Sequence, residues 1–484
     1  MHDFIGLIFY VFRRAIPPAL IGLAAGAALL VPLDRRRRRE GARFPWGQAA
    51  AILLLLCYLG GLAAVTFVDR MEGETRMGVQ LRPFLAFWEA WNAFALQAWL
   101  NPLLNIAMFL PLGVLLPPAV KRFQRWYWML AAGAGTSLLI EALQHTLSRG
   151  QADVDDLLCN TLGAMLGYCL IMVFLSLKGK RWKCAGAYAA LPVLSIAALA
   201  VVFLAYHFQP YGNLADAPIY AANTKGVEWV RECELSDAPG PSGVYWAEPF
   251  TRESCDAFAV EFIERLGAEA DLGSPDVDVN YYDNIAAYSD HRTYSLGVSY
   301  KDRSYHYTDY RIDNDLRHIH IEKGETSTER ELRSALEELG IDVPGAARFF
   351  VVNREEGEYA FRAECVVEDG VLTDGELTCR VAEDGILFEV DNALFVSTLY
   401  GDAAVISSQE AYDRLCAGRF SWRDVPMFDA LSPKRVWVLA CKLEYRTDSK
   451  GFRQPVYSFT LSDDRDAERG GSGWSTFVPA LSEA

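Results

Sequence analysis

Positive charge is scarce in the second half of this 484-residue chain. Residues 207–484 contain 27 Lys and Arg against 51 Asp and Glu, whereas residues 1–206 contain 19 against 11. A sequence-independent nucleic-acid binder needs a basic soluble face, so this class of protein is excluded. The chain is basic and apolar first, then acidic and polar. This order is typical of a membrane anchor joined to a water-exposed domain, and it excludes a wholly cytosolic single-domain protein.

The signatures of common catalytic and cofactor sites are also absent. The sequence contains no Gly-x-Ser-x-Gly motif, no Walker loop and no dinucleotide fingerprint. The acids around Asp276, Asp278 and Asp283 lack the Asp-x-Asp-x-Asp-Gly pattern of a calcium loop. A solvated sheet face, rather than a metal site, is expected for the histidines in predicted strands, which are His291, His306, His318 and His320. The sequence therefore predicts no cofactor, no metal and no catalytic residue set.

Long apolar runs dominate the first 206 residues. A helix needs about 20 apolar residues to cross a hydrocarbon core of about 30 Å. Runs of this kind occur at 15–33, 48–68, 101–120, 126–147, 157–177 and 185–206. Buried helices of a large soluble protein would not produce so many runs in so short a stretch. The sequence therefore predicts an all-α membrane bundle of six transmembrane helices.

Lys and Arg in the short loops predict the orientation of this bundle. The three basic loops, at 35–43, 121–125 and 178–183, all lie on the same side of the membrane, which is therefore cytoplasmic. The first apolar run, at 15–33, is followed by the basic loop at 35–43, so it is expected to stay in the membrane as an anchor and not to be cleaved. Residues 207–484 are then extracytoplasmic, and the aromatic segment 69–100 is expected to form an interfacial helix on the outer side.

Polar residues gather at the predicted outer ends of the helices. An ionisable group within a membrane span costs about 2.5–3.5 kcal/mol unless it is paired or faces a polar cavity, so these residues are expected to be partners. One interpretation is a Glu141–Arg149 pair that closes a helical hairpin, and another is a ligand-binding pocket. A third interpretation is a metal site formed by Glu141, His145 and Asp153 or Asp156, but the sequence lacks the close His-x-x-His or Glu-x-x-His spacing that would support it. The candidate ligand-binding residues are Asn101, Asn105, Glu141, Gln144, Arg149, Asp153, Asp156 and Asn160.

Four strings in this region resemble the VanZ-like family. They are LRPF (81–84), NPLLNIAMFLPLG (101–113), IEALQH (140–145) and RGQADVDDLLCNTLGAMLGY (149–168), and the similarity covers about residues 81–177. The family positions fall on Asn101, Asn105, Phe109, Pro111, Gly113, Glu141, Gln144, Arg149, Asp153, Asp156, Asn160 and Gly163. The resemblance implies a bacterial cell-envelope membrane protein, associated with low-level resistance to glycopeptides of the teicoplanin type. It does not specify a biochemical activity.

The remainder of the chain predicts a linker at 207–226 and an α+β domain at 227–484, with an antiparallel sheet and two similar halves. Strands alternate with short helices at 253–266, 328–339 and 408–417. Asp369-Gly370 and Asp384-Gly385 predict hairpin turns. In pattern, rather than in signature residues, this domain resembles envelope domains of the PepSY and YycH type, which are non-enzymatic.

Six cysteines in this domain permit disulfides in an oxidising compartment. Sequential pairing would join Cys233 to Cys255, Cys365 to Cys379, and Cys416 to Cys441. Buried free thiols are the alternative.

These observations favour a non-enzymatic envelope factor without a nucleic-acid partner. Its membrane module would bind an amphiphile, a lipid-linked wall precursor or a glycopeptide, with Arg149 holding an anionic headgroup. One alternative is an intramembrane enzyme that acts on a lipid-linked substrate, with Glu141 or Asp156 as the acid or base. Another is an envelope sensor whose outer domain binds a protein partner.

Overall fold

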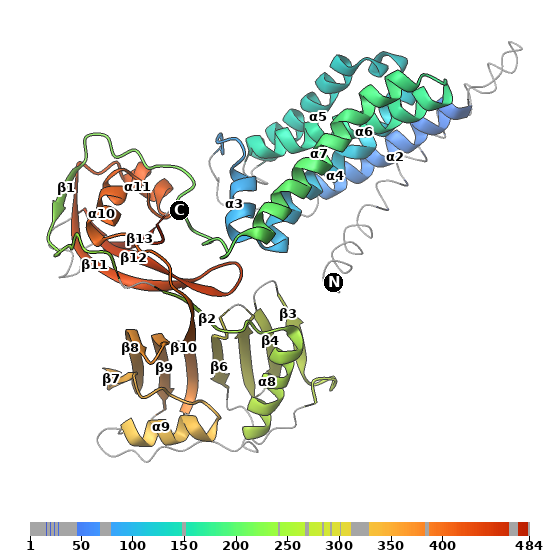
Figure 1. Cartoon of the computed structure of the whole chain (residues 1–484). Helices are drawn as coiled ribbons and strands as arrows, with labels where there is room; N and C mark the ends of the chain where they lie inside the picture. Colours follow the sequence, from blue (N-terminus) through green and yellow to red (C-terminus); the bar gives the residue numbers. More distant parts are fainter. Residues whose placement is uncertain are drawn as a thin grey trace, which may run out of the picture. The chain divides into compact units, whose positions relative to one another are not determined.

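The protein is described by a computed structural model, in which the chain forms two compact units (Figure 1). The model describes residues 46–67, 79–147, 152–240, 243–266, 271–282, 285–290, 293–300, 302–310, 329–382, 387–463 and 473–482, with single positions 16, 20, 24 and 28. The membrane unit comprises residues 1–91 and 95–209, and the C-terminal unit comprises residues 92–94 and 210–484.

The described part of the membrane unit consists of helices. They are α2 (Trp46–Phe67), α3 (Leu85–Ala93), α4 (Leu96–Ala119), the 3-10 turn η1 (Lys121–Gln124), α5 (Trp126–Thr146), α6 (Val154–Lys178) and α7 (Trp182–Phe208). Four of these helices, α2, α4, α6 and α7, are long and apolar enough to cross a membrane. The prediction of six spans is not confirmed, because α5 does not reach the same apolar composition and most of 15–33 lies outside the described residues.

Close backbone packing joins α4 to α6. A Cβ atom on Gly163 would collide with the carbonyl oxygen of Ile106, and one on Gly167 would collide with that of Leu110. Small residues at this spacing allow membrane helices to approach closely. Four prolines lie within α4, yet the helix is continuous from Leu96 to Ala119. Neighbouring helices and local adjustments make proline tolerable in membrane helices.

The C-terminal unit is built on a 13-stranded sheet with a branched order. Its strands are β1 (Glu228–Arg231), β2 (Val244–Trp246), β3 (Asp278–Tyr281), β4 (Ile285–Asp290), β5 (Tyr294–Ser299), β6 (Tyr305–Asp309), β7 (Arg348–Asn353), β8 (Glu358–Glu368), β9 (Val371–Val381), β10 (Leu387–Gly401), β11 (Arg435–Thr447), β12 (Phe452–Ser462) and β13 (Gly473–Pro479). The pairs between named strands are antiparallel except that of β1 with β11. Strand β2 bridges β10 and β12, which joins the two parts of the sheet.

Helices followed by strands recur along this unit (Figure 1). Helix α8 (Arg252–Arg265) precedes β3–β6, α9 (Glu329–Glu338) precedes β7–β10, and α10 (Ser408–Cys416) with α11 (Val425–Leu431) precedes β11–β13. Helices α8 and α9 share one hydrophobic core with β4–β10, whereas α10 and α11 pack in a second core with β11–β13. Amphipathic helices thus cover one face of each part of the sheet, as expected for an α+β domain.

The predicted hairpin turn at Asp369-Gly370 is confirmed, and helix α10 has recognisable signals at both ends. Asp369 and Gly370 both adopt positive φ, 49° and 78°, between β8 and β9, as a two-residue hairpin turn requires. The side chain of Ser407 accepts a hydrogen bond from the Glu410 amide at the start of α10. Gly418 follows α10 with a φ of 79°. The predicted turn at 384–385 lies outside the described residues.

The segment predicted as a linker is bonded into the C-terminal unit. The amide of Gly212 donates to Asp448, and the side chain of Gln454 donates to the Gly212 carbonyl, each at 2.7 Å. The amide of Ala222 donates to the Gly418 carbonyl at 3.0 Å. Residues from 210 onward therefore belong to the folded unit. The prediction of a linker at 207–226 rested on polar residues together with Gly and Pro.

The predicted disulfides are not formed in the structure, where all six cysteines of this unit are free thiols. Cys255 is buried in the first core, whereas Cys233 packs against the second, so the two belong to separate clusters. The register of β8 and β9 pairs Cys379 with Tyr359, six residues before Cys365. At about 3.3 Å per residue, Cys365 and Cys379 lie too far apart for a disulfide.

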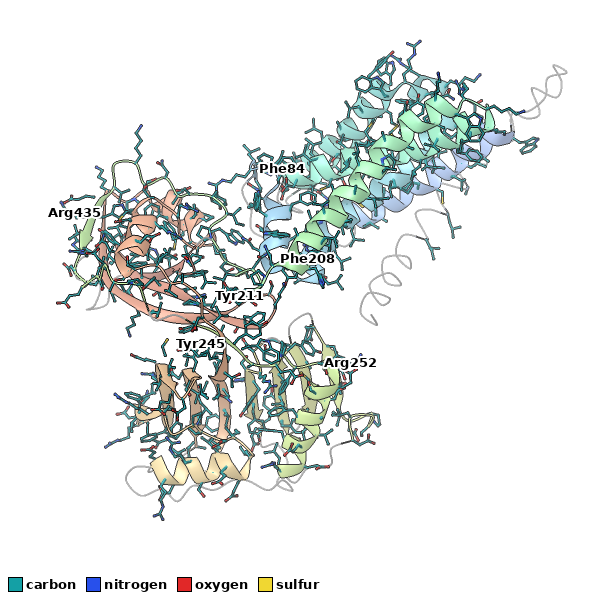
Figure 2. All side chains as sticks on the ribbon, in the orientation of Figure 1. Phe84, Phe208, Tyr211, Tyr245, Arg252 and Arg435 are labelled. Atoms are coloured by element: carbon teal, nitrogen blue, oxygen red, sulfur yellow. The ribbon has the colours of Figure 1, made fainter. Side chains whose placement is uncertain are left out.

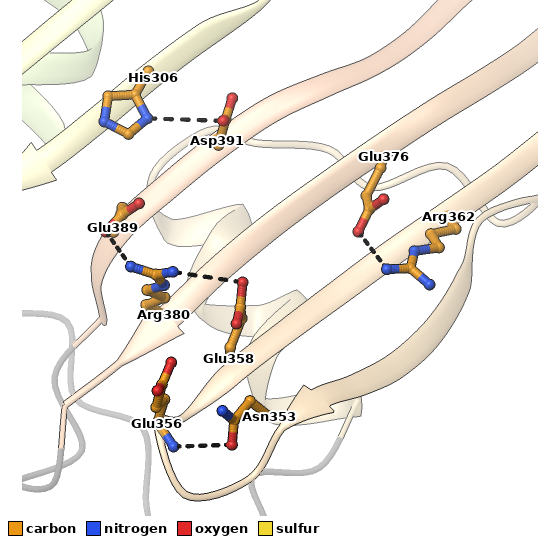
Figure 3. Close-up of polar contacts among 9 residues, drawn as sticks. All are labelled: His306, Asn353, Glu356, Glu358, Arg362, Glu376, Arg380, Glu389 and Asp391. Carbon is orange, nitrogen blue, oxygen red and sulfur yellow. Dashed lines mark hydrogen bonds and ion pairs between the residues drawn. The ribbon is translucent and has the colours of Figure 1, made fainter. Parts of the chain in front are cut away.

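An exposed face of the sheet carries cross-strand ion pairs (Figure 3). Arg380 lies 3.4 Å from Glu389 and 3.7 Å from Glu358, and His306 Nδ1 lies 4.0 Å from Asp391 Oδ2. Exposed pairs of this kind contribute about 0–1 kcal/mol each. His306 therefore lies on a solvated sheet face, as the sequence predicts. The other histidines of that prediction lie outside the described residues: His291, His318 and His320.

Candidate binding site among the membrane helices

Asn105 and Asp156 meet across the glycine-mediated contact of α4 and α6. The amide nitrogen of Asn105 donates a hydrogen bond to Asp156 Oδ1. The two residues are brought together because the neighbouring glycines of α6 leave no side chain between the helices. In a span, such a polar pair satisfies both side chains where water is scarce.

Glu141 holds the connection between α5 and α6. Only 6% of the residue is exposed, and its Oε2 accepts a hydrogen bond from the Asp153 amide at 3.2 Å. The side chain of Asp153 in turn accepts from the Asp155 amide at 2.8 Å, which caps the N-terminus of α6. Arg149, the predicted partner of Glu141, lies outside the described residues.

Asp155 is not among the residues predicted to bind a ligand, yet it makes a buried contact between two helices. It is only 1% exposed, and its two carboxylate oxygens accept hydrogen bonds from the backbone amides of Phe84 and Ala86. These amides lie at the start of α3, where a helix has no backbone partners for its N–H groups and where its dipole favours negative charge. Asp155 thereby fastens the N-terminus of α3 to the N-terminus of α6.

The other candidates lie on separate contacts. Gln144 donates to the Thr66 carbonyl of α2 at 3.1 Å, and Asn160 donates to the Ser137 hydroxyl of α5 at 3.0 Å. Asn101 is exposed, and no hydrogen bond joins its side chain to the described members of this set. Within the described ranges, no group of three or more His, Cys, Asp or Glu residues could hold a metal ion.

An apolar groove of about 800 Å³ lies beside this polar network. Helices α3, α4, α6 and α7 all contribute walls: Phe84, Phe87, Trp88, Trp91, Trp99, Leu103, Ile106, Leu162, Leu166, Ser195, Ile196, Ala198, Leu199, Val201, Val202 and Ala205. Phe84, labelled in Figure 2, is 56% exposed, and Trp88 is 52% exposed. The network and the groove share Phe84, because its amide bonds to Asp155 while its ring lines the groove.

Aromatic contacts along the groove join α3 and α4 to α7. Trp91 of α3 makes an edge contact with Tyr206 of α7, with ring centroids 6.1 Å apart. Trp99 of α4 contacts Phe203 of α7 at 5.3 Å. Rigid rings at the end of membrane helices are typical of the interface between the hydrocarbon and the headgroups. The segment 69–100 thus contains a short aromatic helix, α3, which forms one side of the groove, and its interfacial position stays a prediction.

Comparison with known families matches residues 49–175 to the VanZ/LLP1 family model. The membrane module is VanZ-like. The match extends the resemblance, which covers about residues 81–177, toward the N-terminus to include most of α2. Together with its apolar helices, the VanZ-like module indicates a membrane protein.

Other comparisons add little. No curated protein matches the chain. Among solved structures, an uncharacterized protein from Eubacterium rectale ATCC 33656 is similar at 12% sequence identity, over 52% of this chain and 86% of that one, with a TM-score of 0.27. The resemblance of the C-terminal unit to PepSY-type and YycH-type domains stays a prediction.

Proposed function

We propose that the VanZ-like module is a non-enzymatic envelope factor that binds the hydrocarbon chain of a lipid-linked ligand in the groove. The observation that supports the proposal is the groove itself. Its volume of about 800 Å³ lies in the range of ligand pockets, and its lining is apolar except for Ser195, whose hydroxyl already donates to the Leu191 carbonyl.

Selectivity in such a groove must come from shape and from the headgroup. Lipid tails are as apolar as leucine, so moving a chain from the bilayer into the groove gains no hydrophobic free energy. A rigid aromatic wall discriminates between chains by packing. The Asn105–Asp156 pair lies beside Ile106 of the groove and supplies polar contacts for a headgroup. A role of Arg149 in holding an anionic headgroup remains part of the proposal.

Photo-crosslinking in lipid nanodiscs tests the groove. The probes are a diazirine-bearing polyprenyl phosphate and a diazirine-bearing phosphatidylglycerol, and mass spectrometry locates the labelled residues. We expect the polyprenyl probe to label the groove in preference to the other lipid, and Leu166→Trp to reduce that labelling at least about tenfold because it fills the groove. Leu170→Trp, one turn further along α6 at an exposed position outside the groove, is the matched control. Equal labelling by both lipids, or no effect of Leu166→Trp, would show ordinary annular lipid and refute the proposal.

The proposal also includes a multi-pass topology with residues 207–484 outside the cytoplasm. Intact cells that express Lys225→Cys should react with a membrane-impermeant maleimide, whereas Lys178→Cys should react only after the membrane is opened. Both variants carry Cys184→Ser as well, because Cys184 is an exposed native thiol that would itself react once the membrane is opened. In the C-terminal unit, burial raises the pKa of Cys441 to about 12 and also raises that of Cys233, which lowers their reactivity. The reverse labelling pattern would invert the topology.

The enzyme and sensor hypotheses lead to different results. Both proposed catalytic acids already accept hydrogen bonds, Glu141 from the Asp153 amide and Asp156 from Asn105. If the purified protein converts a lipid-linked precursor to product, and Glu141→Gln stops this conversion, the non-enzymatic proposal is wrong. If the C-terminal unit alone retains all envelope-partner binding, the membrane helices act only as an anchor.

A further inference from the structure

A second cavity, of about 240 Å³, lies within the C-terminal unit. It forms where β6, β10, the end of α9 and the hairpin of β11 and β12 come together. Its apolar surface includes Phe250, Phe258 and Phe395, and its charged lining residues are Asp302, Arg303, Asp342 and Arg453. A small apolar cavity with a few convergent polar groups is the usual form of a small-molecule site.

Arg453 is the unusual member of this lining. It is only 6% exposed, and its guanidinium lies 4.4 Å from the centre of the Phe395 ring. Among the described residues it donates to Asp374 through Nη2 and to Thr447 through Nη1, the latter at 3.3 Å, while Nε–H is buried without a partner. A guanidinium has five N–H donors. The bonds to Asp374 and Thr447 use one N–H of Nη2 and one of Nη1, and Nε–H is itself too deeply buried to reach the cavity. The second N–H of each Nη atom can therefore donate to an oxygen of a ligand in the cavity that Arg453 lines.

The acids around Arg453 decide what kind of ligand suits it. Asp374 already pairs with Arg453, and Asp302, at the cavity wall, adds a second negative charge. Asp302 is held in place because its Oδ1 accepts from both the amide and the hydroxyl of Ser304, at 3.1 and 2.8 Å. Arg303 is committed elsewhere, since it donates to the Glu248 carbonyl at 2.7 Å. Arg453, Asp374 and Asp302 together carry one net negative charge.

A simple anion would be repelled by this net negative charge, and a simple cation would offer no acceptor to the N–H groups of Arg453 that Asp374 and Thr447 do not use. We propose that the cavity binds a small zwitterion of the amino-acid class, with its carboxylate at Arg453 and its ammonium group at Asp302. The side chain of the ligand would lie against Phe258 and Phe395. The volume is below the range of about 300–1,000 Å³ typical of drug-sized ligands, which favours a single amino acid over a longer peptide.

Isothermal titration calorimetry of the full-length protein in detergent tests this proposal. The probes are glycine, alanine, valine and phenylalanine in both enantiomers where they exist. Propionate is the control with a carboxylate only, and propylamine is the control with an ammonium only. We expect at least one amino acid to bind, and both controls to bind at least about tenfold more weakly. No heat from any amino acid at about 10 mM, or equal affinity for propionate, would refute the proposal.

Two variants locate the site. Asp302→Asn lies at a partly exposed position and should weaken amino-acid binding at least about tenfold without changing the melting temperature. Asp237→Asn is an exposed substitution remote from the cavity lining and should change neither. Arg453→Lys should also abolish binding, but the Asp302 variant decides the question if the lysine variant does not fold. Unchanged binding in Asp302→Asn would overturn the assignment. The groove experiment in the membrane unit is unaffected by either result.

Discussion

Replacing Asp155 by asparagine should loosen α3 and leave the rest of the membrane unit folded. The carboxylate of Asp155 accepts one hydrogen bond at each oxygen, from the amides of Phe84 and Ala86. Asparagine offers only one oxygen, and its amide group would face the second N–H with another donor. The change keeps the size of the side chain, so packing at this 1% exposed position is otherwise conserved.

The magnitude follows from these two bonds. A hydrogen bond to a charged group contributes about 1.5–3 kcal/mol, and a buried donor without a partner costs about 1–3 kcal/mol. Loss of the charge near the helix N-terminus adds about 0.3–1 kcal/mol. Because these terms overlap, we expect the free energy of opening α3 to fall by about 2–4 kcal/mol, which corresponds to about 30- to 1,000-fold in the opening equilibrium.

Hydrogen exchange measured by mass spectrometry on the protein in nanodiscs would detect this change. Amides of residues 84–93 should lose protection, whereas those of α4 and α6 should keep it. Labelling of the groove by the polyprenyl probe should fall in parallel, because α3 carries one of its walls.

Asp153→Asn is the matched control. Asparagine caps a helix as well as aspartate does, and the side chain of Asp153 bonds to α6 rather than to α3. This variant should therefore leave α3 protected. If α3 exchanges normally in Asp155→Asn, the carboxylate does not fasten it. If α4 and α6 lose protection equally, its role is in global folding and the reasoning about a local fastening is refuted.

Three further results are expected. Glu141→Gln, at a membrane level matched by immunoblot, should remove any teicoplanin protection that the full chain gives a sensitive Gram-positive host; equal protection would argue against a functional polar network. Gly163→Ala should destabilise the protein by about 1–3 kcal/mol or more, because the new Cβ would meet the α4 backbone. Gly135→Ala, whose Cβ would meet nothing within 4 Å, should be tolerated, as thermal melting in detergent would show. Exposed Cys184 should react with maleimide in the folded protein, whereas Cys379, whose pKa burial raises to about 12, should react only after unfolding; an unreactive Cys379 in unfolded, unreduced protein would indicate a disulfide.

Patterns with a strong physical period could be predicted from the sequence. The apolar runs indicate helices, because a span must satisfy its own backbone hydrogen bonds. Asn105 was expected to share a polar surface with Asp156, and the two side chains meet. Gly163 and Gly167, one helical turn apart, are a small-residue pattern typical of close helix contacts, and the α4 backbone lies against both.

The position of Asp155 could not be predicted in the same way. It lies one residue before Asp156, and successive helical residues point in directions about 100° apart, so the two acids face different neighbours. The partners of Asp155 are backbone amides of a distant segment, which have no sequence signature. Only the tertiary arrangement of α3 against α6 distinguishes a fastening acid from its neighbour.

The lengths of two strands could not be predicted from the sequence, because polar residues interrupt their apolar pattern. Strand β9 runs from Val371 across Asp374 to Val381, and β10 runs from Leu387 across Asp391 and Asn392 to Gly401. Gly375 lies within β9 with a φ of 107°. A Cβ at this position would collide with the Ala393 carbonyl, so only glycine allows the two strands to pair this closely. Glycine within a strand thus marks a close backbone approach rather than an end.

The packing and binding interpretations of the polar residues need not compete. Glu141 fixes the start of α6 through the Asp153 amide, and Asp155 fixes the start of α3. Both contacts bond a carboxylate to backbone amides and so position helices. Helix α3 supplies aromatic residues to the proposed site, so its position also affects binding. A substitution at either acid can therefore remove ligand binding while the protein stays in the membrane, which activity alone would not distinguish from the loss of a direct contact. Hydrogen exchange separates the two, because a direct contact predicts lost labelling with the helix starts still protected. A fastening role predicts that labelling is lost together with the protection of α3 for Asp155, or of the start of α6 for Glu141.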